Sequence, residues 1–144
     1  MKKFNWILIV LILPLQILLA QDENKIMGKW TNEDQTQVIQ VEKKGEVFVG
    51  QLADYKNGND EVLLDLENKD EEKRSRNLLG EDVWLNFIFD PAKEIWTSGE
   101  IYNFKNGNIY NGKIQVEEDE LKLTGHYGFF FFLAKTQKWT RVLN

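Results

Sequence analysis

The sequence predicts an all-β protein, built as a single antiparallel up-and-down β-barrel of about eight strands. Apolar and polar residues alternate with a period of two in short runs separated by turn residues, which is typical of an antiparallel sheet. The sequence contains no long, strongly amphipathic helical pattern. A flat meander of this size would expose two strand edges, whereas closure into a barrel pairs them.

Residues 1–20 are expected to form a secretory signal peptide. Lys2 and Lys3 precede an apolar run from Trp6 to Leu19, and Ala20 is the small residue expected at a cleavage site. The run is shorter than the ~20 residues of a membrane-spanning helix, which disfavours the alternative of an uncleaved anchor. We therefore expect residues 21–144 to form one extracytoplasmic domain, periplasmic or secreted, with no transmembrane span after cleavage.

The charge and the absence of cysteine exclude several classes of function. Without Lys2 and Lys3 the chain keeps 16 basic and 23 acidic residues, a formal net charge of −7. Binding to nucleic acid or to an anionic membrane surface needs clustered basic residues, so neither is expected. A chain without cysteine cannot form zinc-thiolate sites or use a cysteine nucleophile.

The first strands follow from the alternation and its breaks. Residues 36–43 and 46–53 form a predicted hairpin around a turn at Lys44-Gly45. The next strand ends at Asp90-Pro91, because proline cannot donate to the sheet. Its inward face comprises Val83, Leu85, Phe87 and Phe89, and its outward face includes Trp84 and Ile88.

The second half of the chain continues the meander. Residues 94–104 lead into Asn106-Gly107, which suits a tight hairpin turn. Two strands follow around an acidic turn at residues 117–120, and residues 131–142 form the last strand. The inward face of the two strands comprises Tyr110, Gly112, Ile114, Val116, Leu121, Leu123, Gly125 and Tyr127. Glycines at inward positions allow the sharp bending that barrel closure requires.

The connection from Asn57 to Asn77 interrupts the strand pattern. It ends in a dense run of mixed charges at residues 67–76, which suits a solvated loop or one or two turns of surface helix. The functional alternative is a lid over one mouth of the barrel.

Four residues near the chain ends predict how the barrel is sealed. They are Gly28 and Trp30 on the first strand and Trp139 and Arg141 on the last. A Gly-x-Trp paired with a late arginine resembles the lipocalin-like (calycin) barrels. The resemblance implies that Trp30 plugs the closed end and that Arg141 packs across its ring, with guanidinium donors reaching free carbonyls. The alternative is an unrelated core tryptophan and surface arginine.

A second resemblance extends from about Ile26 to Val142. The sequence resembles the bacterial envelope family catalogued as domain of unknown function number 2147. The matching stretches are Ile26 to Trp30, Leu78 to Gly80, Gly99 to Tyr102, Asn106-Gly107, Tyr110 to Lys113 and Thr136 to Arg141. The resemblance implies a secreted or periplasmic small barrel and no particular reaction. Family members often carry a cysteine pair before the Leu-Leu-Gly stretch, and this chain does not.

The residues with catalytic or metal-binding chemistry do not form a recognisable set. His126 is the only histidine and falls on an outward strand face, so it is a poor base or metal ligand. The acidic turn lacks the spacing and glycine of an EF-hand loop. We therefore expect a protein that is not an enzyme and that uses no cofactor or metal.

Aromatic residues supply the remaining functional signal. We expect a small cavity whose mouth lies opposite Trp30 and binds a small apolar or amphipathic ligand. The candidate ligand-binding residues are Phe89, Tyr110, Tyr127, Phe129, Phe130, Phe131 and Phe132. The alternative is a structural or protein-interaction module of the envelope, with a filled barrel and exposed aromatics near Trp84 and Phe130 that contact a protein partner.

Overall fold

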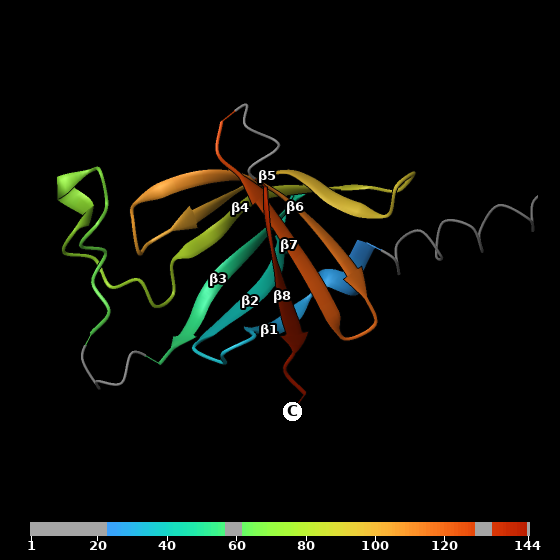
Figure 1. Ribbon diagram of the computed structural model, residues 1–144, viewed down its shortest axis with the longest axis horizontal. Coiled ribbons are helices and arrows are strands. Elements are labelled where there is room, and N and C mark those ends of the chain that lie inside the picture. Colours follow the sequence, from blue (N-terminus) through green and yellow to red (C-terminus); the bar gives the residue numbers. More distant parts are fainter. Residues whose placement is uncertain (1–22, 57–61, 129–133, 144) are drawn as a thin grey trace, which may run out of the picture.

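The computed structural model describes residues 23–56, 62–128 and 134–143, which contain a closed antiparallel barrel of eight strands in chain order (Figure 1). The strands are β1 (Gly28–Asn32), β2 (Gln37–Lys44), β3 (Val47–Tyr55), β4 (Asp82–Asp90), β5 (Ile95–Asn103), β6 (Asn108–Glu117), β7 (Glu120–His126) and β8 (Lys135–Arg141). Two short 3-10 helices accompany them, η1 (Asn24–Ile26) before β1 and η2 (Glu71–Lys73) between β3 and β4. The predicted all-β up-and-down barrel is confirmed.

The barrel closes between the first and last strands. Trp30 of β1 lies opposite Arg141 of β8, and the register continues through Thr31 with Thr140 and Asn32 with Trp139. Closure thus places the Gly-x-Trp motif of the first strand and the Trp-x-Arg motif of the last in adjacent strands.

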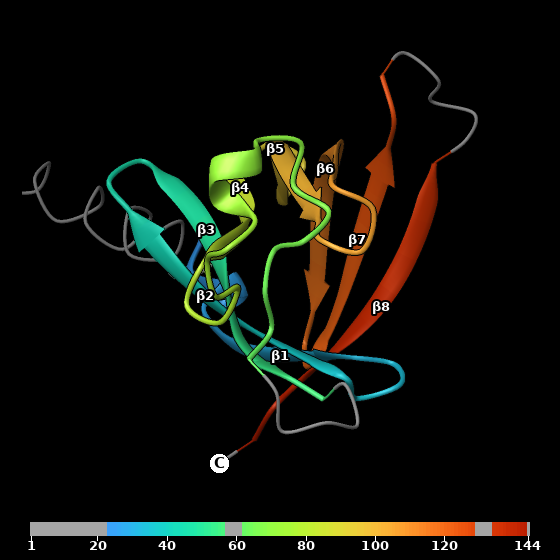
Figure 2. The same cartoon turned by 90° about the vertical axis from the view of Figure 1, so that its left-hand side faces the viewer.

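The connections alternate between the two ends of the barrel, as an up-and-down topology requires. The closed end carries η1 and the β2–β3, β4–β5 and β6–β7 turns. The other end, here called the mouth, carries the β1–β2, β3–β4, β5–β6 and β7–β8 connections. Figure 1 shows η1 on the right and the β3–β4 connection on the left, and Figure 2 shows that connection in front of the barrel strands.

Inward glycines make room for large side chains in the core. Gly99 of β5 faces Phe87 of β4, and a Cβ atom added at Gly99 would overlap the Phe87 ring. Phe87 is 1% exposed. The ring therefore fills the space that a side chain at position 99 would otherwise occupy, and the two strands curve around it.

The predicted outward position of Trp84 is wrong. Trp84 is 3% exposed and belongs to the core, together with Phe87. Across β3 and β4, Gly50 pairs with Trp84 and Phe48 with Phe87, so β4 contains one residue more than β3 over this stretch. Asn86 has a φ angle of 56° there. This β-bulge shifts the alternation, so that Trp84 and Phe87 both point inward.

The other outward prediction for β4 agrees with the structure, because Ile88 is half exposed. No helix in the described part of the chain has both the length and the apolar character needed to cross a membrane.

Candidate ligand-binding site

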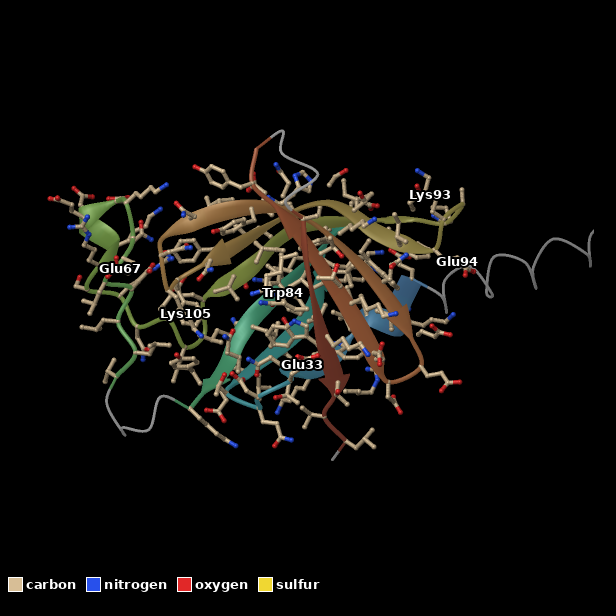
Figure 3. All side chains as sticks on the ribbon, in the orientation of Figure 1. Glu33, Glu67, Trp84, Lys93, Glu94 and Lys105 are labelled. Atoms are coloured by element: carbon tan, nitrogen blue, oxygen red, sulfur yellow. The ribbon has the colours of Figure 1, made fainter. Side chains whose placement is uncertain are left out.

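A cavity of about 340 Å³ lies at the mouth of the barrel. Inward-facing residues of β4, β5, β6, β7 and β8 contribute to its wall, and the β5–β6 turn adds Phe104 and Lys105. In Figure 3, Trp84 lies within the barrel and Lys105 toward the mouth, whereas Lys93 and Glu94 mark the closed end.

Aromatic rings form much of the cavity wall, and one pair of them is buried whereas the other is partly exposed to solvent. Trp84 and Trp139 pack edge to face with centroids 5.0 Å apart, and both are almost fully buried. Tyr110 and Tyr127 form a second ring pair at 5.7 Å, and Tyr127 is half exposed. The cavity thus has a deep apolar part and a shallower part where tyrosine rings meet solvent.

Two glycines that face each other across β6 and β7 shape the wall. Gly112 pairs with Gly125. A Cβ atom at Gly112 would lie 2.8 Å from Ile101 Cδ1, so the Ile101 side chain already occupies that space. Gly125 itself lines the cavity, and a Cβ atom there would lie 3.3 Å from Ile101 Cδ1 and 3.6 Å from Tyr110 Cβ.

The polar part of the wall is basic and amide-rich. Lys135 and Gln137 alternate with Trp139 along β8, and all three line the cavity. Lys105 lines it from the β5–β6 turn. Asn103 and Gln37 complete the polar lining, and none of the described lining residues is an aspartate or glutamate.

A buried polar network fixes the β3–β4 connection beside the cavity. Asp65 is fully buried and accepts hydrogen bonds from the Tyr102 hydroxyl at 2.5 Å and from Asn68 Nδ2 at 2.7 Å. Arg76 donates to the same carboxylate through Nε at 2.9 Å and forms an ion pair through Nη2 at 2.8 Å. The four side chains tie the connection to β5, because Tyr102 belongs to that strand.

Tyr102 joins this network to the cavity. Its ring lines the cavity, and burial, together with the hydrogen bond to Asp65, raises the pKa of its hydroxyl to about 12. The phenol is therefore neutral at physiological pH and acts as a hydrogen-bond donor to Asp65.

The charged connection was predicted to be solvated, and the structure agrees only in part. Lys69, Glu71, Glu72 and Lys73 are exposed, and η2 begins after Asp70, whose side chain accepts from the Glu72 amide. Asp65 and Arg76 belong instead to the buried network. Sequence reasoning missed them because an aspartate in a charged loop is usually solvated, and its partner Tyr102 is 37 residues away. An Asp directly after the apolar stretch 62–64 was the available signal.

The predicted mouth residues separate into three groups. Tyr110 and Tyr127 line the cavity. Phe89 does not, and its prediction is wrong: it pairs with Trp96 near the β4–β5 turn at the closed end, with ring centroids 4.9 Å apart. Phe129, Phe130, Phe131 and Phe132 lie outside the described residues.

The closed end contains the Trp30 and Arg141 pair in contact. The Arg141 guanidinium lies 4.2 Å from the centroid of the Trp30 ring, and it donates to Met27 O at 2.8 Å and to Lys25 O at 2.7 Å. Trp30 Nε1 donates to Ile26 O at 2.8 Å. The indole and the guanidinium therefore satisfy the carbonyls of the η1 segment that covers this end.

The other two residues predicted for closure, Gly28 and Trp139, have different surroundings in the structure. Gly28 has a φ of 114°, and a Cβ atom there would lie 3.1 Å from Arg141 Nη1, so glycine suits this position. Trp139 lies opposite Leu121, near the β6–β7 turn, but its ring packs on Trp84 and lines the cavity. Its role in the seal is therefore replaced by a role in the cavity wall.

Comparisons with known proteins agree with this architecture. Residues 28–141 match the family described as an uncharacterized protein conserved in bacteria (DUF2147). The chain belongs to the DUF2147 family. The structure of this family member is similar to that of protein HP1028 from Helicobacter pylori, which is described as belonging to the lipocalin family, with a TM-score of 0.73. The two share 18% sequence identity, and the match covers 83% of this chain and 84% of that chain.

At that identity the likeness to HP1028 shows a lipocalin-like fold. No curated protein matches the DUF2147 chain. Within the described ranges, no group of three or more His, Asp or Glu side chains could hold a metal ion.

Proposed function

We propose that this DUF2147 protein is a non-catalytic binding protein that holds a small amphipathic ligand in the cavity at the barrel mouth. The observation that carries the proposal is the cavity of about 340 Å³, with Trp84 and Trp139 on one part of its wall and lysine and amide side chains on another. Ligand cavities in proteins span about 300 to 1,000 Å³ and combine apolar walls with a few polar groups.

The alternative of a filled barrel with an exposed aromatic surface has less support. It relied on exposed aromatics near Trp84 and Phe130; Trp84 is buried in the core, and Phe130 lies outside the described residues. The interior is also not filled, because the cavity extends to that ring.

The binding proposal is tested with octan-1-ol, a neutral amphiphile that fits the cavity. Titration followed by calorimetry and by tryptophan fluorescence should show saturable binding at a stoichiometry of one. Gly125→Leu places an alkyl group in the cavity and should abolish that binding. Lys113→Leu adds the same group to an exposed position on β6 and should leave it intact.

Absence of saturable binding, or equal binding to both variants, would contradict the proposal. Native mass spectrometry of the protein purified from its own envelope fraction provides an independent check, because a stoichiometric small ligand should be recovered.

We also propose that the protein is exported, on the basis of the residue 1–20 pattern. Amino-terminal sequencing of the mature protein should find Gln21 first. An intact amino terminus on protein from the cytoplasmic fraction would contradict export.

A further inference from the structure

We propose that the cavity selects an anionic amphiphile, one whose alkyl or aryl part contacts Trp84 and Trp139 and whose carboxylate meets Lys135 at the mouth. This inference rests on the proposed binding function and specifies the ligand class. It also assigns Lys135 as the main specificity residue and Lys105 as a secondary one.

The charge of the cavity wall differs from the charge of the chain. The full sequence carries 23 acidic and 18 basic residues. The described cavity wall nevertheless contains two lysines, Lys105 and Lys135, and no carboxylate. A wall that is basic within an acidic protein favours a negative group over a positive one, and low-dielectric side chains around the opening strengthen that preference.

The position of Lys135 suits contact with a ligand. Lys135 lies directly opposite Gly125 in the β7–β8 register, so no side chain from the adjacent strand separates it from the cavity. Among the described residues it forms no ion pair within 4.0 Å, whereas Lys138, on the outer face of the same strand, lies 3.8 Å from Glu120. The Lys135 ammonium group is thus available to a bound anion.

Lys105 is expected to bind the ligand carboxylate more weakly than Lys135, because the Asp34 carboxylate interacts with it. Asp34, in the β1–β2 turn, has a lowered pKa, chiefly through hydrogen bonds with Thr36 and to a smaller extent through the charge of Lys105. Part of the Lys105 charge is therefore compensated. We expect its removal to affect an anionic ligand less than removal of Lys135.

The cavity also limits the size of the ligand. A cavity of about 340 Å³ is near the lower end of the range of about 300 to 1,000 Å³ that ligand cavities span. The ligand class that we propose is therefore a small single-chain or single-ring monocarboxylate, such as octanoate.

The test compares three probes that share one alkyl chain: octanoate, octan-1-ol and octylammonium. Binding to the full mature domain is measured by calorimetry at low and high salt. We expect octanoate to bind about tenfold more tightly than octylammonium, and added salt to weaken octanoate but not octan-1-ol.

Substitutions of single lysines test which side chain is responsible for the preference for octanoate. Lys135→Gln should weaken octanoate about tenfold and leave octan-1-ol within about twofold, because one charge-assisted hydrogen bond is lost. Lys105→Gln should have a smaller effect in the same direction. Lys138→Gln removes an equal charge from the outer face of β8 and should behave like the unmodified protein for all three probes.

The outcomes separate the two proposals. If octan-1-ol binds as tightly as octanoate, or if Lys138→Gln weakens octanoate as much as Lys135→Gln, the selection of anions is wrong and the binding function stands. Tighter binding of octylammonium also overturns the selection. If no probe binds, the binding function itself fails.

Discussion

Arg141 is the residue on which the closed end depends most. Its guanidinium contacts the Trp30 ring, donates to two carbonyls near η1 and approaches Asp119 Oδ1 at 3.1 Å. Few side chains satisfy backbone acceptors and cover an aromatic ring at once, and arginine can do so because its donors are fixed in a plane. Lysine at this position would lose the fork geometry.

Arg141→Ala should lower the free energy of unfolding by about 2 kcal/mol, through lost ring contact and lost hydrogen bonds to carbonyls. Chemical denaturation measures the change. Arg74 is the control: it is an exposed arginine that donates to Asn68 O at 2.8 Å and lies 3.5 Å from Glu71, so Arg74→Ala should change stability by less than about 1 kcal/mol. Equal effects of the two substitutions would show that the closed end does not depend on Arg141.

Tyr102 should make stability depend on alkaline pH. Its pKa is about 12 in the folded protein and near 10 in an unfolded chain. Between those values the folded state binds more protons than the unfolded state, so the free energy of unfolding falls as pH rises. The stabilising contribution is complete below about pH 10 and is lost by about pH 12, with a total on the order of 2 kcal/mol.

The measurement is the pH dependence of stability in two variants. Tyr102→Phe should lack this alkaline loss, whereas Tyr127→Phe, at a half-exposed position of the mouth, should keep it. If the free energy of unfolding of Tyr102→Phe fell between about pH 10 and pH 12 as steeply as that of the wild-type protein, Tyr102 would not be the cause of the alkaline loss of stability.

The β3–β4 connection shows how an irregular element can be held in one place. It has one backbone bridge of its own, between Leu64 and Asn77, and the Leu78 amide donates to Leu63 O at 2.8 Å. Two sets of contacts link it to the barrel: Asp65 accepts from Tyr102 of β5, and backbone hydrogen bonds join Leu52 of β3 to Gly80 and Glu81. Arg76, within the connection, bonds to the same carboxylate. A carboxylate removed from water in this way is tolerated because each partner is a donor.

Asp65→Ala should release the connection while the barrel stays folded. The substitution removes hydrogen bonds to a charged group and leaves the Tyr102 hydroxyl without its acceptor, whereas Arg76 keeps its ion pair with Glu81. The expected cost is about 1.5 to 3 kcal/mol, which should appear as faster hydrogen exchange over residues 63–80. Asp70→Ala is the control, because Asp70 is exposed and its side chain contacts only the short helix η2, through the Glu72 amide and, at 3.7 Å, Lys73. Unchanged exchange in Asp65→Ala at the Asn68 and Leu78 amides, which donate to Asp65 O and Leu63 O, would contradict the proposed link.

The strands differ in how far their sequence predicts them. The β6 and β7 patterns follow strict alternation, and burial in the structure has their predicted phase. The β2–β3 hairpin was predicted without an inward face, and its register shifts between Val38 and Ile39. The alternation fails in β4, where the bulge at Asn86 turns Trp84 inward. A positive φ at asparagine depends on pairing with the neighbouring strand, which the local sequence does not specify.

At the scale of the whole molecule, the barrel is sealed at one end and open at the other. The seal consists of Trp30, Arg141 and η1. The open end contains the cavity and the β3–β4 connection, which the Asp65–Tyr102 hydrogen bond holds in place. A ligand bound there would contact β4 through β8 at once, so occupancy should stabilise the whole barrel.

Octan-1-ol at tenfold excess over its dissociation constant should raise the free energy of unfolding by about 1.4 kcal/mol. For a domain of this size, that corresponds to a rise in melting temperature of roughly 3 to 6 °C. Differential scanning calorimetry measures the shift, and Gly125→Leu should show none. An equal shift in Gly125→Leu would indicate a solvent effect.

The sequence by itself determined the approximate number and the order of the strands and favoured closure of the barrel, because period-two patterning and turn residues are local properties. The contact between Trp30 and Arg141 was implied by the resemblance to lipocalin-like barrels, and the structure contains it. The sequence also contained enough to place Phe89: turns alternate between ends, so a residue beside the Asp90-Pro91 turn lies at the end that Trp30 seals. Only the tertiary structure decided which side chains surround the cavity. The β4 bulge, the Trp84–Trp139 contact and the Asp65–Tyr102 bond all join residues distant in sequence, and their positions depend on how the strands pair around the closed barrel.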